Sequence, residues 1–145
     1  MKKNQTISDT AKSIKRKLPD KPKGTRYSDN DLMEFKELIL KKIEESKLEL
    51  KYYQDAIMHY NEHGTDDTVS SFKSFEDSSL NQEKEYLHQM AERQRIYIDN
   101  LEKALIRIEN KTYGICRATG NLIRKDRLRS VPHATLSIEA KLNQH

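Results

Sequence analysis

Two long apolar stripes with helical spacing, separated by a polar segment, constrain the fold of this chain more than any other feature. The first stripe consists of Leu32, Phe35, Ile39, Ile43, Leu50, Tyr53 and Ile57. The second consists of Leu80, Leu87, Met90, Tyr97, Leu101, Leu105 and Ile108. Spacings of mostly three, four and seven residues keep each set on one face of a helix. The sequence therefore predicts two long helices, each with one apolar face.

Polar residues mark the ends of these two helices. Ser28 can cap the first helix, and Asp31 follows three residues later, where a capping box places an acid. The polar cluster at residues 61–68 interrupts the apolar pattern. Two helices of similar length joined by a polar loop fold back on each other. Residues 26–112 are therefore predicted to form an antiparallel coiled-coil hairpin with a tip loop at about residues 61–79.

The two ends of the chain differ from the hairpin in composition. Residues 1–24 hold eight Lys or Arg and two Asp, a net charge of +6, whereas the whole chain has a formal charge of +4. Residues 1–25 are therefore predicted to be a disordered basic arm. A two-helix hairpin buries little apolar surface, so we expect residues 113–145 to form a small globular part, with a short C-terminal helix, that closes its open end. The predicted fold class is mainly α.

Cysteine content and hydropathy limit the compartment in which the chain works. The single cysteine excludes a disulfide framework and favours a reducing environment. No apolar run approaches the roughly 20 residues that span a bilayer. No apolar stretch follows the basic N-terminal residues, as it would in a signal peptide. We expect a cytoplasmic protein without membrane contact.

A specific motif lies where the second helix is expected to end. Tyr113-Gly114-Ile115-Cys116 is an aromatic-Gly-x-Cys step, and basic residues and Leu follow it, up to Pro132. Together with Ser137-Ile138-Glu139-Ala140-Lys141 and the hairpin, these segments resemble the DksA/TraR family over about residues 27–142. The resemblance implies a non-enzymatic transcription regulator. In that family the hairpin enters the secondary channel of RNA polymerase, and the cysteine motif opens a zinc finger.

The resemblance places the four zinc ligands of the family on Cys116, Thr119, Ser137 and Ala140. Only the cysteine can bind zinc as a thiolate, and His133 is the one nearby substitute, whereas a structural site needs about four nitrogen or sulfur ligands. We therefore predict a degenerate finger without zinc, in which the cysteine is a buried small hydrophobe. Packing must then hold the finger together, through Tyr113, Ile115, Leu122, Ile123, Leu128, Val131, Leu136 and Ile138.

Acidic residues near the hairpin tip are the candidate effector groups. The resemblance implies that the tip brings carboxylates close to the catalytic magnesium of the polymerase. The two acids of the family's tip motif fall here on Lys73 and Glu76, so one acid remains, with Asp77 beside it. Glu76 and Asp77 are the first candidates, and Asp66 and Asp67 are the second. The alternative is that these carboxylates only solubilise a loop and begin a helix, where acids are favoured.

Basic residues at the other end are candidates for contact with the polymerase rim or with the alarmone ppGpp. They are Arg93, Arg124, Arg127, Arg129 and Lys141. Three basic positions that the family uses for ppGpp fall here on Asn100, Val131 and Lys141. Only Lys141 is basic, which argues against ppGpp binding, so no cofactor is predicted. The alternative is a solvated basic face.

No catalytic motif is visible in the sequence, so we predict that the chain is not an enzyme. Two other functions compete with polymerase binding. A nucleic-acid-binding protein would use the basic arm and residues 124–129, but the sequence lacks a recognition-helix signature and stacking aromatics. A structural coiled-coil module would need an intermolecular stripe, whereas a hairpin predicts a monomer. We therefore expect a monomer that binds RNA polymerase and contacts DNA only indirectly.

Overall fold

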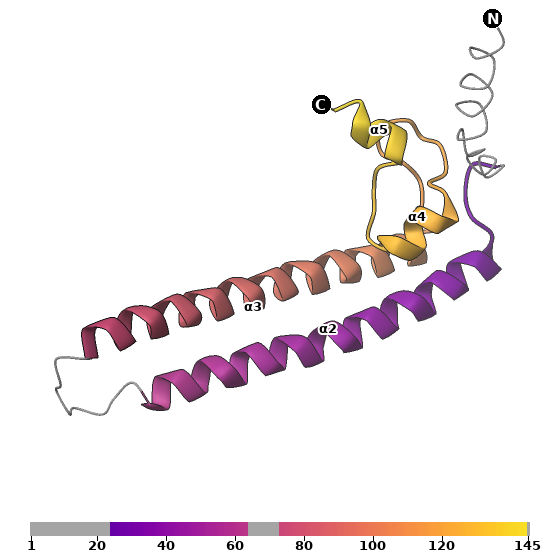
Figure 1. Ribbon diagram of the computed structural model, residues 1–145. Coiled ribbons are helices and arrows are strands. Elements are labelled where there is room, and N and C mark those ends of the chain that lie inside the picture. The colour runs from indigo at the N-terminus through magenta and orange to yellow at the C-terminus, as the bar shows by residue number, and fades with distance from the viewer. Residues whose placement is uncertain (1–23, 64–72, 145) are drawn as a thin grey trace, which may run out of the picture.

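Two long helices dominate the computed structural model, which describes residues 24–63 and 73–144, with side chains from Ser78 onward in the second range. In these ranges the helices are α2 (Asp29–His63), α3 (Lys73–Glu109), α4 (Lys125–Ser130) and α5 (Ile138–Leu142). Helices α2 and α3 lie side by side in opposite directions, and the two short helices gather where α2 begins and α3 ends (Figure 1). The predicted mainly α fold with a helical hairpin is confirmed.

The start of α2 follows the predicted cap. The backbone amide of Asp31 donates to the Ser28 hydroxyl oxygen at 3.2 Å, which satisfies one of the free amides of the first turn. The predicted basic arm at residues 1–25 lies outside the described residues except for its last two, and so do the candidate acids Asp66 and Asp67. Within the described ranges, neither long helix has an apolar stretch sufficient to cross a bilayer.

The interval between the long helices is narrower than the predicted tip loop at about residues 61–79. Helix α2 continues to His63, and α3 already begins at Lys73. The first difference arises because the sequence has no Gly or Pro between Asp29 and Gly64, so polar residues continue the helix. The second arises because acids are favourable in a first helical turn, and a pair of serines on an exposed helix face costs little. Gly64 itself lies outside the described residues.

The larger hydrophobic cluster lies at the end of the hairpin that carries the short helices, and we call it the base cluster. It contains fifteen buried residues of the described chain. Those from the long helices are Leu32, Phe35, Ile39, Ile43, Leu101, Ala104 and Ile108. A smaller outer cluster toward the tip contains three, Ile57, Leu87 and Ala91, with partly buried neighbours such as Leu50 and Tyr53. The base therefore has the larger core of the two parts that the structure describes.

The predicted stripe of α3 needs one correction and three additions. Leu80 is 43% exposed, so it does not belong to the core. Ala91, Ile98 and Ala104 are buried instead, although the sequence pattern did not include them. Alanines contribute little to an apolar pattern, but their small side chains fit a helix interface without leaving gaps. The apolar face of α3 is therefore partly built from residues that carry a weak sequence signal.

Candidate functional site

The segment after α3 forms a tight turn that carries the cysteine. Gly114 and Gly120 both have positive φ, 76° and 73°, which only glycine adopts at little cost. Ile115 and Leu122, which lie on either side of the turn, form an isolated antiparallel bridge. The amide of Cys116 donates to the carbonyl of Asn121 at 2.8 Å. The backbone of this turn therefore folds through its own hydrogen bonds.

The four positions that correspond to zinc ligands in the family lie together in a hydrogen-bonded group. The Ser137 amide donates to Sγ of Cys116 at 3.4 Å, and the Ser137 hydroxyl accepts from the Ala140 amide at 3.2 Å. Cys116 is fully buried, and Ser137 and Ala140 are also buried, whereas Thr119 is exposed. The serine caps α5, so one side chain both begins the last helix and lies against the cysteine.

Opposing effects set the pKa of Cys116. Burial raises it, but hydrogen bonds from the Thr119 side chain and the Ser137 backbone lower it by more, so the pKa falls to about 6. One thiolate does not make a zinc site, since the other three positions offer two hydroxyls and a methyl group. In the part of the chain with described side chains, no group of three or more His, Cys, Asp or Glu could hold a metal ion. The donor set of this finger does not fit zinc.

Packing within the finger follows most of the prediction. Tyr113, Leu122, Ile123 and Leu128 are buried, and three more of the predicted residues are partly buried. Burial raises the pKa of Tyr113, whose hydroxyl donates to the carbonyl of Pro132 at 2.7 Å. Ile138 was predicted to pack in the finger, but this prediction is wrong, because its side chain is 43% exposed. As the first residue of α5, it follows the buried cap and faces away from the core.

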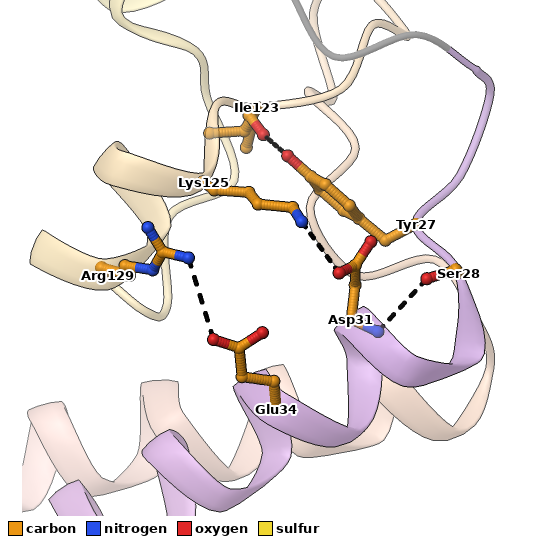
Figure 2. Close-up of polar contacts among 7 residues, drawn as sticks. All are labelled: Tyr27, Ser28, Asp31, Glu34, Ile123, Lys125 and Arg129. Carbon is orange, nitrogen blue, oxygen red and sulfur yellow. Dashed lines mark hydrogen bonds and ion pairs between the residues drawn. The ribbon is translucent and has the colours of Figure 1, made fainter.

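An aromatic contact joins the finger to the start of α2 (Figure 2). The hydroxyl of Tyr27 donates to the carbonyl of Ile123, and the buried ring packs edge-on against Phe35 at a centroid distance of 5.7 Å. Burial and the charge of Asp31 raise the pKa of Tyr27 to about 12, so the hydroxyl remains a donor. A Cβ atom on Gly114 would lie 2.6 Å from this ring. A side chain at position 114 would therefore displace the tyrosine.

Two ion pairs flank this aromatic contact (Figure 2). Nζ of Lys125 lies 2.8 Å from Oδ1 of Asp31, and a guanidinium nitrogen of Arg129 lies 3.8 Å from Oε1 of Glu34. Hydrogen bonds from Lys125 and from the Ser28 hydroxyl lower the pKa of the Asp31 carboxyl. These two ion pairs fix α4 to the first turns of α2. The pair made by Arg129 is the longer of the two.

The structure divides the predicted basic residues into two groups. Arg124 is largely covered and pairs with Glu139 at 3.4 Å, and Nε of Arg127 donates to the carbonyl of Leu136 at 2.9 Å. Both line a shallow pocket together with Ser137. Arg129 and Lys141 are exposed on the same finger, whereas Arg93 is exposed on α3. The two covered arginines hold the finger together, so the exposed ones are better placed to meet a partner.

The tip acids are only partly within the described residues. Glu76 and Asp77 lie in the first five residues of α3, and nothing is described of their side chains. Their backbone belongs to a helix and not to the predicted loop. The two candidate acids are therefore carried by the first turns of a regular helix.

Sequence reasoning missed two residues that position the finger. Tyr27 was not assigned to the core, because its hydrogen-bond partner lies 96 residues away in the chain. Arg107 is partly buried, which lowers its pKa, and it donates to the carbonyl of His133 at 3.4 Å. The available sequence signal for Tyr27 was its position as an aromatic residue directly before the Ser28 helix cap. No sequence signal distinguishes this arginine from its exposed neighbours.

Comparisons with known proteins agree with this architecture. The family described as the prokaryotic dksA/traR C4-type zinc finger matches residues 111–141. The RNA polymerase-binding transcription factor DksA of Caulobacter vibrioides is 44% identical over 50 residues, which is 34% of this chain and 35% of that protein. General stress protein 16O of Bacillus subtilis is 36% identical over 47 residues, 32% of this chain and 29% of that protein. These alignments span about a third of the relatives' own length.

A solved structure extends the similarity to the hairpin. The transcription factor DksA2 from Pseudomonas aeruginosa superposes with a TM-score of 0.67 and 25% sequence identity. The superposition covers 78% of this chain and 81% of that one, so it extends well beyond the finger into the long helices. The finger is therefore similar in sequence, and the fold similar over most of the chain, to proteins of the DksA/TraR family.

Proposed function

We propose that this protein regulates transcription by binding RNA polymerase, with its hairpin inserted into the secondary channel. The observation that carries the proposal is the match in fold to a transcription factor over most of both chains. The Caulobacter relative is named as an RNA polymerase-binding transcription factor, which supports the same partner. Such a protein acts in the cytoplasm and needs no catalytic residues of its own.

In this proposal the base and the tip have different tasks. The finger and the base of the hairpin supply most of the contact area, and Arg129 and Lys141 meet acidic groups on the polymerase rim. The hairpin is a rod of 35- and 37-residue helices, so its tip lies far from the finger. Glu76 and Asp77 at the start of α3 then act near the catalytic magnesium, where carboxylates have metal and basic groups to interact with.

The finger in this proposal folds without zinc. The hydrogen bonds among Cys116, Ser137 and Ala140, with the surrounding apolar core, take the structural place of the metal. Lys141 is the one basic residue left at the three positions that the family uses for ppGpp, so the proposal does not rely on that alarmone. It works as a monomer, and any contact with DNA is made through the polymerase.

A binding and transcription experiment with two matched double variants tests the proposal. Glu76→Gln with Asp77→Asn removes the charge at the helix start and keeps approximate shape. This variant should bind core polymerase within several-fold of the wild type and lose most of its effect on initiation in vitro. Crosslinks from the tip should reach residues that line the secondary channel. If the wild-type protein does not bind core polymerase, the proposal fails.

The comparison pair is Asp66→Asn with Asp67→Asn, which removes the same charge earlier in the chain. We expect this pair to keep most of the effect on initiation. If it abolishes the effect while the first pair retains it, the assignment of the tip acids is wrong. If neither pair matters and the protein still regulates, obstruction of the channel or contact with the rim replaces the acidic mechanism. Strong, salt-sensitive DNA binding by the isolated protein would favour a nucleic-acid-binding function instead.

A further inference from the structure

A polar layer crosses the hairpin between the base cluster and the outer cluster. On α2, Ser46 is the buried residue that separates Ile43 of the base from Ile57 of the outer part, and it is 5% exposed. On α3, Gln94 lies between Ala91 and Ile98 at the half-buried face of the helix. Polar side chains therefore stand on both helices where the apolar stripe is expected to continue.

The hydrogen bonds of this layer are incomplete. Nε2 of Gln94 donates to the carboxylate of Glu49 at 2.7 Å, whereas its carbonyl oxygen Oε1 is buried and accepts no hydrogen bond from any described residue. A buried acceptor without a partner destabilises the packing around it. The contact between Glu49 and Gln94 and that between Tyr60 and Glu83 fix one antiparallel register. In this register Ser46 lies opposite Tyr97, next to the edge of the base cluster.

The two parts that the layer separates differ in how they are packed. The base is covered by the finger, and aromatic contacts tie it together, with Phe35 against Tyr113 at 5.3 Å and Tyr97 against His133 at 5.3 Å. Among the described residues, the outer part consists of two helices that pack on each other, with Ile57, Leu87 and Ala91 as its buried residues. A helix pair that buries so little apolar surface opens more readily than a core covered on several sides.

We infer that the layer of Ser46, Glu49 and Gln94 is a hinge, at which the outer half of the hairpin bends and opens while the base remains folded on the finger. The inference goes beyond the proposed function, and its test needs no polymerase, so either can fail alone. For a rod that must enter a channel, such a hinge lets the tip adjust after the base has docked.

Hydrogen exchange on the full-length protein, followed by mass spectrometry, tests the hinge. Amides in residues 50–60 and 83–91 should exchange through an opening that leaves residues 35–43 and 101–108 protected. Gln94→Leu removes the buried amide and should slow exchange of the two outer segments by about tenfold, since the unpartnered acceptor is lost. The base segments should change little. Ser46→Ala should slow the same outer segments to a smaller extent.

The control is Gln89→Leu, the same substitution at an exposed position of the same helix, which should leave all segments unchanged. Three results would overturn the hinge. The first is that the four segments exchange together in the wild type, in one cooperative opening. Gln94→Leu could slow the base as much as the outer half. Gln89→Leu could reproduce the effect, which would show that added hydrophobicity alone is responsible.

Discussion

At the scale of single residues, Gly114 shows how one backbone position controls the docking of the finger. Its φ of 76° favours glycine, and the space that a Cβ would take is filled by Tyr27. Tyr27, just before α2, in turn connects the start of that helix to Ile123 of the finger. The finger can therefore pack against Tyr27 because position 114 has no side chain.

We expect Gly114→Ala to lower the free energy of unfolding by about 2–4 kcal/mol, from the strained φ together with the clash on the tyrosine ring. Gly120→Ala is the matched control, since this glycine has nearly the same φ of 73° but no atom within 4 Å of a built Cβ. It should cost about 1–2 kcal/mol. Chemical denaturation of both variants measures the difference, and equal costs would mean that the tyrosine contact adds nothing.

The pH dependence of stability should depend on His133. Burial lowers the pKa of its imidazole, with further lowering by Arg107 and Arg127, and Nδ1 is buried without a hydrogen-bond partner among the described residues. At high pH the imidazole is neutral in both the folded and the unfolded state, so its lowered folded-state pKa does not affect the free energy of unfolding. The histidine destabilises the fold as the pH falls below its unfolded pKa of about 6.5. His133→Phe keeps a ring against Tyr97 and removes this protonation.

Melting temperatures at about pH 7.5 and about pH 5.5 check this prediction. The wild type should lose more stability on acidification than His133→Phe. Contributions from Cys116 and Asp31 occur in both proteins, so they cancel in the comparison. His88→Phe, at an exposed position of α3, should show the same acid loss as the wild type. An equal loss in His133→Phe would exclude a role for this imidazole.

At the scale of elements, the long helices could be predicted because their apolar spacing persists over many turns. The ends of the helices at the tip could not, since polar residues continue a helix as readily as they begin a loop. Leu80 matched the stripe but lies on the exposed end of α3, and Ala91 was missed because its side chain carries little apolar signal. Spacing therefore identifies the helix and its general face, but packing decides which residues are buried.

The register of α3 can be tested with alanine substitutions. Leu101 is fully buried in the base cluster, so Leu101→Ala should cost roughly 2–5 kcal/mol of unfolding free energy. Glu102→Ala, at the exposed neighbouring position, should cost about 0.5 kcal/mol or less. Leu80→Ala should resemble the glutamate variant more than the buried leucine, because the side chain is 43% exposed. Denaturant titrations measure all three, and equal effects at positions 101 and 102 would reject the register.

The finger should be independent of metal. Three of its four ligand positions carry no thiol or imidazole, and hydrogen bonds connect them instead. Elemental analysis of purified protein should find substoichiometric zinc, and a chelator should leave the melting curve unchanged. A relative with all four cysteines is the positive control for the chelator. One tightly bound zinc per chain would contradict the prediction.

At the scale of the whole molecule, a short finger packs against the base of a long hairpin and stabilises it there. Contacts far apart in sequence, such as Tyr27 with Ile123 and Asp31 with Lys125, close the N-terminal end of α2 onto the segment after α3. The sequence predicted that residues 113–145 would cover the open end, because a bare hairpin leaves apolar surface exposed. It could not predict which residues make the contact, since no local pattern links positions almost a hundred residues apart.

Two truncations test where the folded molecule begins. Removing residues 1–24 should leave the melting temperature nearly intact, because that segment is basic and offers little apolar surface to offset the entropy of ordering it. Removing residues 1–28 also deletes Tyr27, which is 3% exposed, and the Ser28 cap. Loss of a buried aromatic side chain costs about 3–5 kcal/mol, and loss of a cap about 1 kcal/mol. Thermal unfolding monitored by helical circular dichroism should therefore separate the two truncations clearly. A large fall in melting temperature for the shorter truncation would show that the basic arm stabilises the fold, and no fall for the longer one would mean that the tyrosine contact is dispensable.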